Sequence, residues 1–251
     1  MTLKLTSLNV KGLNSPNKRQ LLLRTLKSDR VNIAFIQETH LVKHAKAVLT
    51  DHVFTREFSS RALSKRNGVS ILIRKSCPFQ GVLYKYEVDG RYVLLSGSLY
   101  SKTYHFLNVY APNASATDFW SSICAVLDTL PHGTIVLGGD MNATPCPAVD
   151  ISDRPVLSEL PSVSMQDKTF ARFLQRMGLI DVWHVTNPSV RDYTFYSAPH
   201  GSHSRIDLFL LNGTTMSHVI RAEINSISWS DHADIALYLH TPRVAAPWSW
   251  R

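Results

Sequence analysis

Cysteine is scarce in this sequence, and long apolar runs are missing from it. Among 251 residues only Cys77, Cys124 and Cys146 occur, and their wide, irregular spacing fits neither a disulfide framework nor a zinc cluster. No apolar run reaches the roughly 18 residues of a transmembrane helix. The N-terminal segment MTLKLTSLNV also lacks the apolar stretch of a secretory signal. These absences favour a soluble, intracellular protein with no membrane partner.

Acidic residues are in the minority. The chain has 19 Asp and Glu against 27 Lys and Arg, which gives a formal net charge of +8 and a pI near 9.5. Such a balance favours a polyanionic partner such as DNA. With 44% hydrophobic residues the chain can bury one large core, so we expect a single domain over residues 1–240. Residues 241–251 show no periodicity and are expected to be a tail, either a surface strap or the start of a linker to a further domain.

The apolar segments predict many strands interleaved with few helices. Strands are expected at residues 3–10, 31–37, 68–75, 91–100, 104–112, 134–140, 193–197 and 204–211, with the last two inside residues 226–240. Helices are expected at residues 17–29, 118–130 and 168–177. The Pro-, Ser- and Asp-rich stretch 146–164 is expected to be a surface excursion. This order predicts an α/β sandwich of two packed sheets.

Short polar motifs follow several of these apolar segments. In chain order they are SLNVKGLN (7–14), IQETH (36–40), NVYAPN (108–113), GGDMN (138–142), SRIDLFLL (204–211) and SDH (230–232). Polar groups at strand ends can be held rigidly and made to converge, as a hydrolytic site requires. We therefore take the carboxylates, amides and imidazole of these motifs as candidate site residues.

The first candidates are Asn9 and Glu38, which end two neighbouring predicted strands. A carboxylate at the end of a buried strand is costly unless it is paired or binds a cation. Mg²⁺ prefers one or two carboxylates together with water and substrate phosphate. Glu38 is therefore a candidate metal ligand, and Asn9 a residue that completes or orients the same shell. Taken singly, either residue is better explained as a capping or turn-forming group, and only the two together favour a site.

Asp140 and Asn142 flank Met141, and alternate residues of an extended segment point the same way. The carboxylate can accept a proton from an attacking water, while the amide can donate to a phosphoryl oxygen. A simple Gly-Asp turn is the alternative interpretation.

His232 needs a partner that fixes its tautomer or charge, and Asp207 is the natural choice because strand pairing could bring it close. Asp231 is expected to help bind either the metal or the scissile phosphate. Tyr110, at the end of a predicted strand, could donate its hydroxyl to a phosphate oxygen, although a lone aromatic is more often a core residue.

The ordered series of motifs resembles the endonuclease/exonuclease/phosphatase superfamily, which includes apurinic/apyrimidinic endonucleases, DNase I-like nucleases and inositol phosphatases. Residues 179–211 closely resemble the endonuclease domain of non-LTR (LINE-type) retrotransposons. The resemblance covers residues 3–240 and implies a four-layered α/β sandwich with two packed mixed β-sheets flanked by helices. Matched by position, Asn9 and Glu38 would serve the metal and Tyr110 and Asn142 the phosphate. Asp140 would position or activate water, Asp207 would orient His232, and Asp231 would complete the site.

The same resemblance implies a Mg²⁺-dependent endonuclease, with Mn²⁺ able to substitute. It would nick one strand of double-stranded DNA and leave a 3′-hydroxyl that primes reverse transcription. The element's RNA would be bound only by domains outside this sequence. We expect a monomeric isolated domain, synthesised in the cytoplasm and acting in the nucleus.

The segment APHGSH (198–203), between two predicted strands, is the expected reader of DNA. A slim polar hairpin can enter a minor groove, where shape and deformability count for more than a unique base code. Its candidate DNA-contacting residues are Thr194, His200, Ser202, His203, Ser204 and Arg205. A solvated hairpin without DNA contact is the alternative.

Other functions remain open on the sequence alone. An abasic-site repair endonuclease could use the same core, although we identify no pocket for a base-free sugar. A small-molecule phosphatase is disfavoured by the basic charge. A catalytically inactive DNA-binding module is disfavoured because each matched catalytic position holds the expected residue type.

Overall fold

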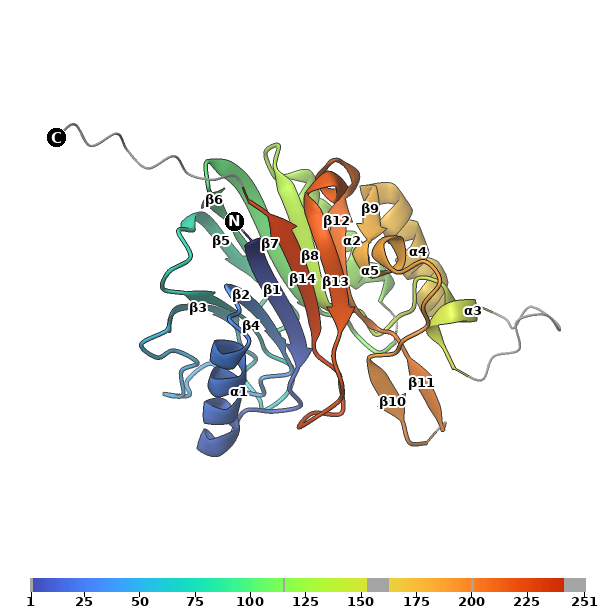
Figure 1. Ribbon diagram of the computed structural model, residues 1–251. Helices are drawn as coiled ribbons and strands as arrows, with labels where there is room; N and C mark the ends of the chain where they lie inside the picture. The colour runs from blue at the N-terminus through green and yellow to red at the C-terminus, as the bar shows by residue number, and fades with distance from the viewer. Residues whose placement is uncertain (1, 115, 153–162, 200, 242–251) are drawn as a thin grey trace.

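Two six-stranded mixed sheets face each other in the computed structural model, which describes residues 2–114, 116–152, 163–199 and 201–241 (Figure 1). The first sheet has the strand order β13 (Val219–Ile224), β14 (Ile235–His240), β1 (Thr2–Asn9), β2 (Ile33–Gln37), β4 (Val69–Arg74) and β3 (Phe54–Ser60). The second has the order β5 (Gln80–Tyr86), β6 (Tyr92–Leu99), β7 (Lys102–Tyr110), β8 (Thr134–Asp140), β12 (Asp207–Asn212) and β9 (Leu179–Asp181). The pairs β1–β2 and β7–β8 are parallel.

Three apolar clusters account for the layers. One lies between the sheets and includes Phe35, Phe106 and Phe209. A second joins the outer face of the second sheet to helices α2 (Thr117–Asp128) and α4 (Met165–Met177). A third joins the outer face of the first sheet to α1 (Pro16–Ser28). The order helix, sheet, sheet, helix confirms the four-layered α/β sandwich.

Strand β2 illustrates why the sequence folds this way. Its residues IAFIQ are buried throughout. Ile33 and Phe35 pack between the sheets, while Ala34 and Ile36 pack toward α1. A strand covered on both faces needs a continuous apolar run instead of an alternating one, which is what the sequence supplies.

The three predicted helices are confirmed, with boundaries shifted by a few residues. Helix α1 begins at Pro16 after Ser15, although the Ser15 side chain makes no capping hydrogen bond. Helix α4 begins at Met165, earlier than expected. Its N-cap Ser164 accepts from the Asp167 amide, and the helix ends at Gly178, whose φ of 59° suits glycine.

Four strands of the two large sheets were missed, and they share a reason. Strands β3, β5, β9 and β13 lie at sheet edges and carry mixed polar and apolar residues. The expectation of two strands within residues 226–240 was wrong, because only β14 lies there. The single strand expected over residues 204–211 is divided, since Ser204 ends β11 (Ser202–Ser204) and Asp207 begins β12.

The remaining elements are a hairpin at the end of the sandwich that carries the polar motifs, and three short helical segments. Strands β10 (Phe195–Ser197) and β11 form a separate hairpin that projects from this end (Figure 1). The short elements are α3 (Pro147–Asp150), α5 (Val182–Thr186) and the 3₁₀ helix η1 (Gly213–His218). The expected surface excursion, residues 146–164, contains α3, which ends at the buried Asp150. Residues 153–162 of this stretch lie outside the described residues.

Two further sequence expectations concern the ends of the chain and the membrane. Of the expected tail 241–251, only Thr241 is described. None of the described helices is long and apolar enough to cross a membrane.

Candidate active site

Both sheets deliver polar side chains to one edge of the sandwich. Asn9 ends β1, Tyr110 ends β7 and Asp140 ends β8, while Glu38 directly follows β2 and Asp207 begins β12. Asp140 is the register partner of Tyr110 on one side and of Asp207 on the other. The strand ends are thus aligned before any side-chain contact is considered.

Asn9 joins the two sheets through its side chain. Its Nδ2 donates to Glu38 Oε1 at 2.8 Å and to Asp140 Oδ2 at 2.9 Å, and the whole residue is buried. Its Oδ1 accepts from the Lys11 backbone amide at 3.1 Å. Both polar atoms of the Asn9 side chain are therefore hydrogen-bonded, and its Nδ2 orients two carboxylates that come from different sheets.

His232 completes this chain of contacts. Its Nδ1 lies 2.8 Å from Asp207 Oδ2, and its Nε2 lies 3.9 Å from Asp140 Oδ2. The sequence predicts that strand pairing brings Asp207 beside His232. The contact instead joins the two sheets, because His232 lies in the loop before β14 of the first sheet and Asp207 begins β12 of the second. Phe195 of the hairpin holds the imidazole from the side, with ring centroids 4.7 Å apart.

The electrostatics of this group are unbalanced. Burial, followed by the charge of Asp207, raises the pKa of Asp140 to about 7. Burial alone would lower the pKa of His232, but Asp207, Asp140 and Asp231 outweigh it and raise that pKa to about 9. One oxygen of Asp207, Oδ1, is buried and has no hydrogen-bond partner among the residues that the structure describes. Negative charge therefore exceeds what the surrounding donors compensate.

Tyr110 and Asn142 lie beside the carboxylates. Tyr110 is 9% exposed, and burial together with the charge of Glu38 and a hydrogen bond to it raises the pKa of its phenol far above the usual range. Tyr110 therefore stays a neutral donor. The backbone amide of Asn142 donates to Asp140 Oδ1 at 2.9 Å, and its Nδ2 donates to the Ala111 carbonyl at 2.8 Å.

The expected extended arrangement of residues 140–142 is corrected by the structure. Asn142 has a φ of 46°, in the left-handed region. The chain therefore turns after Asp140, and the Asn142 side chain is placed by this turn and by Ala111 instead of by strand alternation.

Asp231 lies at the rim of the site. Its Oδ2 pairs with Lys11 Nζ at 2.6 Å, and the two side chains are 33% and 63% exposed. Burial would raise the pKa of Asp231, but the hydrogen bond from Lys11 holds it below its ordinary value. A second rim contact was missed from the sequence: His40 Nε2 lies 3.1 Å from Glu38 Oε2.

The donor set fits a divalent cation. Asp140, Asp207 and His232 each offer one ligand atom, and these atoms lie within 4.8 Å of one another. The unpartnered Asp207 oxygen and the raised pKa of Asp140 are what a site short of positive charge would show. Glu38 is tied to Asp140 through Asn9 and adds a third carboxylate. The metal role expected for Glu38 and Asn9 stays a prediction.

The hairpin residues predicted to contact DNA differ in position. Ser202 and Ser204 are half-buried on β11. His203 is exposed and packs against Tyr196, with ring centroids 4.7 Å apart and ring planes tilted by 43°. His200 lies outside the described residues. The hairpin thus offers an aromatic and imidazole face to solvent.

Thr194 does not reach solvent, and its expected phosphate contact is corrected. It is fully buried, and its Oγ1 accepts from the backbone amides of Ile206 and Asp207, both at 3.1 Å. Its carbonyl accepts from the Ala233 amide at 2.7 Å. Thr194 therefore fixes the base of the hairpin between the Asp207 strand and the His232 loop.

Arg205 is likewise removed from the DNA-contacting set, because it is 1% exposed and paired inside the protein. Its Nε lies 2.8 Å from Asp150 Oδ1 and its Nη2 lies 2.5 Å from Asp181 Oδ2. His184 contacts the same two carboxylates at 3.1 and 3.2 Å. Asp150, Asp181, His184 and Arg205 are called the Arg205 cluster below.

A buried amide network beneath the site was also missed. Gln37 Nε2 donates to Ser7 Oγ at 3.0 Å and to Asn108 Oδ1 at 2.6 Å. Asn108 Nδ2 donates to the carbonyls of Ile36 and Ser70. The sequence did contain a signal of this network, because polar residues stand inside otherwise apolar strands. Buried polar side chains require hydrogen-bond partners.

Comparison with known proteins gives relatives of matching architecture. The chain is 26% identical over 242 residues to the Transposon TX1 uncharacterized 149 kDa protein of Xenopus laevis, covering 94% of this chain and 18% of that protein. The chain thus spans less than a fifth of this relative.

Solved structures agree on the fold. The AP endonuclease LMAP from Leishmania major aligns with a TM-score of 0.78 at 16% identity, over 96% of this chain and 88% of that one. The APE2 catalytic domain from Xenopus laevis gives 0.76 at 16% identity, over 94% and 91%. The 3′-phosphatase NExo from Neisseria, bound to a product DNA hairpin, gives 0.74 at 20% identity, over 95% and 100%.

The sequence profile of the Endonuclease/Exonuclease/phosphatase family matches residues 6–232. This span contains the strand-end residues described above, from Asn9 to His232. The resemblance found in the motifs is confirmed, and the transposon relative supports its retrotransposon part. The chain belongs to the Endonuclease/Exonuclease/phosphatase family and is a metal-dependent phosphodiester hydrolase.

Proposed function

We propose that this protein nicks one strand of duplex DNA in a Mg²⁺-dependent reaction and leaves a 3′-hydroxyl that primes reverse transcription of a non-LTR retrotransposon. One observation carries the proposal: Glu38, Asn9, Asp140, His232 and Asp207 form an unbroken chain of contacts across the two sheets. The net charge of +8 and the transposon relative support a DNA substrate. Action in the nucleus after cytoplasmic synthesis, and a monomeric domain, belong to the same proposal.

The chemistry divides among the residues by their surroundings. Asp140, whose pKa is raised to about 7, is the group best suited to accept the proton of an attacking water. Asn9 and the Asn142 amide hold its two oxygens and so fix its direction. A Mg²⁺ ion bound by Glu38 with the neighbouring carboxylates would supply positive charge against the developing charge of the phosphate and leaving oxygen.

Three further groups of the site can donate hydrogen bonds to the phosphate. His232 is charged at neutral pH, because the surrounding carboxylates raise its pKa to about 9, and its Nε2–H is available to a phosphoryl oxygen. Tyr110 keeps its hydroxyl proton and can donate in the same way. Asn142, half-exposed beside them, has a second amide hydrogen beyond the one given to Ala111.

The hairpin is proposed to set where the strand is cut. Tyr196 and His203 lie on it as exposed rings in contact with each other, and Ser202 and Ser204 flank His203. Because Phe195 contacts His232 and Thr194 contacts the Asp207 amide, DNA held by this hairpin would lie at the catalytic pair. Replacing residues 199–203 with a Gly-Ser turn should change the mapped nick sites more than the basal rate, and an unchanged cleavage pattern would remove the hairpin from the proposal.

The experiment that tests the function is a nicking assay on supercoiled plasmid with Mg²⁺. Nicked circles should form, and a DNA polymerase should extend their ends without prior phosphatase treatment, as a 3′-hydroxyl allows. An intact duplex and the same duplex with one abasic site should be compared in parallel. Cleavage confined to the abasic duplex would replace this proposal with abasic-site repair, and binding without metal-dependent cleavage would indicate an inactive DNA-binding module.

A further inference from the structure

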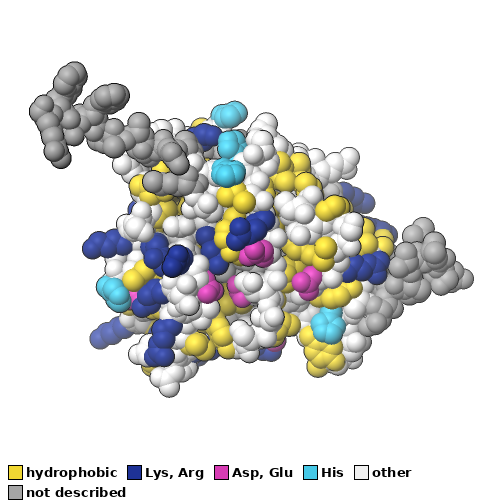
Figure 2. All heavy atoms as spheres, viewed as in Figure 1, with side chains coloured by type: hydrophobic (Ala, Val, Ile, Leu, Met, Phe, Trp, Pro, Cys, Tyr) yellow, Lys and Arg dark blue, Asp and Glu magenta, His cyan; other side chains and the backbone are white. Residues whose placement is uncertain are grey.

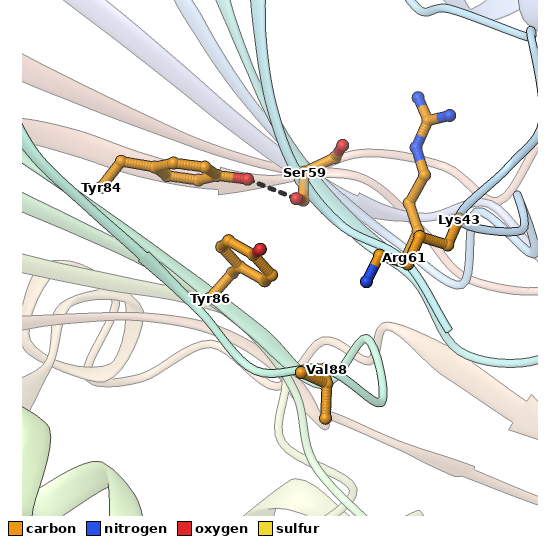
Figure 3. A pocket seen from close by; sticks show the side chains of 6 residues that line it. All are labelled: Lys43, Ser59, Arg61, Tyr84, Tyr86 and Val88. Carbon is orange, nitrogen blue, oxygen red and sulfur yellow. Dashed lines mark hydrogen bonds between the residues drawn. The ribbon is translucent and has the colours of Figure 1, made fainter. Parts of the chain in front are cut away.

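A second cleft lies at the open edge of the sandwich, away from the strand ends that carry the catalytic carboxylates. It has a volume of about 330 Å³ and lies between β3 and β5, which are edge strands of opposite sheets. Its lining residues are Lys43, Ser59, Arg61, Tyr84, Tyr86 and Val88 (Figure 3). Clefts of about 300 Å³ and above are large enough for small organic ligands, so a nucleobase with its sugar is within range.

Two tyrosine rings form one wall. Tyr84 and Tyr86 are alternate residues of β5, 39% and 50% exposed, with ring centroids 5.3 Å apart and planes tilted by 30°. Figure 3 shows the rings side by side, with the Tyr84 hydroxyl turned toward Ser59, to whose carbonyl it donates a hydrogen bond. Phe58 packs edge-on against Tyr84 at 5.5 Å. Tyr84 is thereby fixed, and Tyr86 keeps an open ring face.

Positive charge forms the opposite wall. Arg61 is committed elsewhere, since its guanidinium binds Glu57 and the carbonyls of Ala45 and Ala47 and points away from the rings (Figure 3). Lys43 is exposed, and no described residue pairs with its ammonium. Lys and Arg side chains gather on the side of the molecule where α1 and β3 lie (Figure 2). The cleft therefore offers an aromatic surface beside an available cation.

We propose that this cleft binds single-stranded nucleic acid, with a base stacked on Tyr86 and a backbone phosphate beside Lys43. Aromatic faces along a positively charged groove are the combination by which proteins hold unpaired strands without sequence preference. An extended peptide could pair with edge strand β5 instead, but it would make no particular use of an open tyrosine face beside an unpaired lysine. The net charge of +8 also favours the polyanion.

Two segments of the chain run from the cleft to the active site. Lys43 follows Glu38 in the same loop, and its amide is held by the Ala62 carbonyl at 3.0 Å. Beyond Tyr86, Glu87 accepts from the Arg91 amide at 3.0 Å, and the Arg91 guanidinium lies over the Tyr110 ring at 4.8 Å. An unpaired strand that flanks DNA in the active site could therefore continue into the cleft, although binding itself does not depend on the proposed nicking.

The test is fluorescence anisotropy with a labelled oligothymidine of about 12 nucleotides, within the usual site size of such proteins, in buffer without divalent cations. Tyr86→Ala should weaken binding about fivefold to 100-fold, the usual range for losing one stacked base. Tyr86→Phe, which keeps the ring, should bind like the wild type. Val82→Ala is the matched control, because Val82 is 85% exposed on the same strand and does not line the cleft.

Three more measurements separate this proposal from the nicking function. Lys43→Gln should lower the slope of log affinity against log salt by about 0.7, as expected for one phosphate contact on a single strand. Tyr86→Ala should nick plasmid at the wild-type rate and melt at the same temperature as Val82→Ala. His232→Ala should lose nicking and keep oligothymidine binding.

Unchanged oligothymidine affinity in Tyr86→Ala would overturn the proposal, and so would an equal loss in Tyr86→Phe. An unchanged salt slope in Lys43→Gln would remove the phosphate contact even if Tyr86→Ala failed to fold. A cleft that binds a peptide instead would leave the oligothymidine affinity of every variant unaltered.

Discussion

The protein contains two buried groups of charged side chains that differ in how well their charges are matched. In the Arg205 cluster, two carboxylates meet one guanidinium and one imidazole, and His184 and Arg205 both reach Asp150 and Asp181. In the candidate active site, four carboxylates (Glu38, Asp140, Asp207 and Asp231) pair, within the described part of the chain, with the imidazoles of His232 and His40 and with the exposed Lys11. The charges of the Arg205 cluster balance, whereas the candidate active site has an excess of negative charge.

The pKa shifts follow this difference. Burial would raise the pKa of Asp181, but hydrogen bonds from His184 and the charge of Arg205 lower it below its ordinary value. Burial and the nearby Asp207 charge raise the pKa of Asp140 instead. A matched buried network can hold a structure in place, whereas an unmatched one is suited to receive a cation and a phosphate. The Arg205 cluster supports the hairpin base, since the Arg205 amide also donates to the Asp150 carbonyl at 2.9 Å.

The largest expected effect comes from removing one charge of the candidate active site. Asp207→Asn keeps the size of the side chain and the oxygen that accepts from His232, and it removes a charge whose Oδ1 has no partner. Nicking should fall by about 10²-fold to 10⁴-fold, because His232 loses the carboxylate that keeps it charged and oriented. Plasmid nicking rates and thermal unfolding should be measured together. A wild-type rate would refute the role of Asp207, and a collapse of stability would place this site in the same class as the Arg205 cluster.

The opposite result is expected in the matched cluster. Arg205→Met keeps most of the buried volume but leaves His184 as the one cationic partner of Asp150 and Asp181 among the described residues. The free energy of unfolding should therefore fall by about 3–5 kcal/mol. Urea denaturation measures this loss. Arg172→Met on the exposed face of α4 is the control, with an expected change within about 0.5 kcal/mol. Equal stability of the two variants would show that the cluster contributes little to the fold.

The cluster should also make stability depend on pH. Hydrogen bonds to Asp150 and Asp181 raise the pKa of His184 from 6.5 to about 9. A group whose pKa is raised by folding contributes its full stabilisation at pH values below its unfolded-state pKa. This stabilisation is lost as the pH rises through the folded-state pKa. Wild type should therefore lose about 1–3 kcal/mol relative to His184→Gln between pH 6 and pH 10. Parallel urea titrations over that range measure the difference, and a constant difference would mean that His184 is not charged in the fold.

The smallest expected effect concerns the missing charge in the catalytic site. Mg²⁺ should raise the melting temperature of the wild type by about 2–4 °C for each kcal/mol of binding energy, and EDTA should reverse it. Asp140→Ala should show a smaller shift, and His184→Gln should show the wild-type shift. The same shift in Asp140→Ala as in wild type would place the cation elsewhere.

Much of the site was predictable because its residues stand at strand ends, where a strand's direction and partners fix the side chain. Asn9, Glu38 and Asp140 were found in this way, and the sandwich followed from the alternation of apolar segments. Arg205 shows the limit of this reasoning. Its partners Asp150 and Asp181 are distant in sequence, so the same letters that suggested a surface DNA contact also suit a buried ion pair.

The edge strands show a second limit. Strand β5 alternates polar and apolar residues weakly, because none of its residues is buried on either face. Its pattern therefore carries little signal of a strand or of a binding surface. Thr194 shows a third limit of reasoning from sequence. Its buried hydroxyl is explained by the backbone amides that the fold brings to it, and these are not visible in the sequence.

The central claim is that residues remote in sequence act as one metal-dependent hydrolytic site. The most direct test compares Mg²⁺-dependent plasmid nicking by the wild type with nicking by Asp140→Ala and His232→Ala, each checked for unfolding at the wild-type temperature within a few degrees. We expect nicked circles from the wild type and none above background from either variant. Nicking at the wild-type rate by either folded variant would contradict the claim.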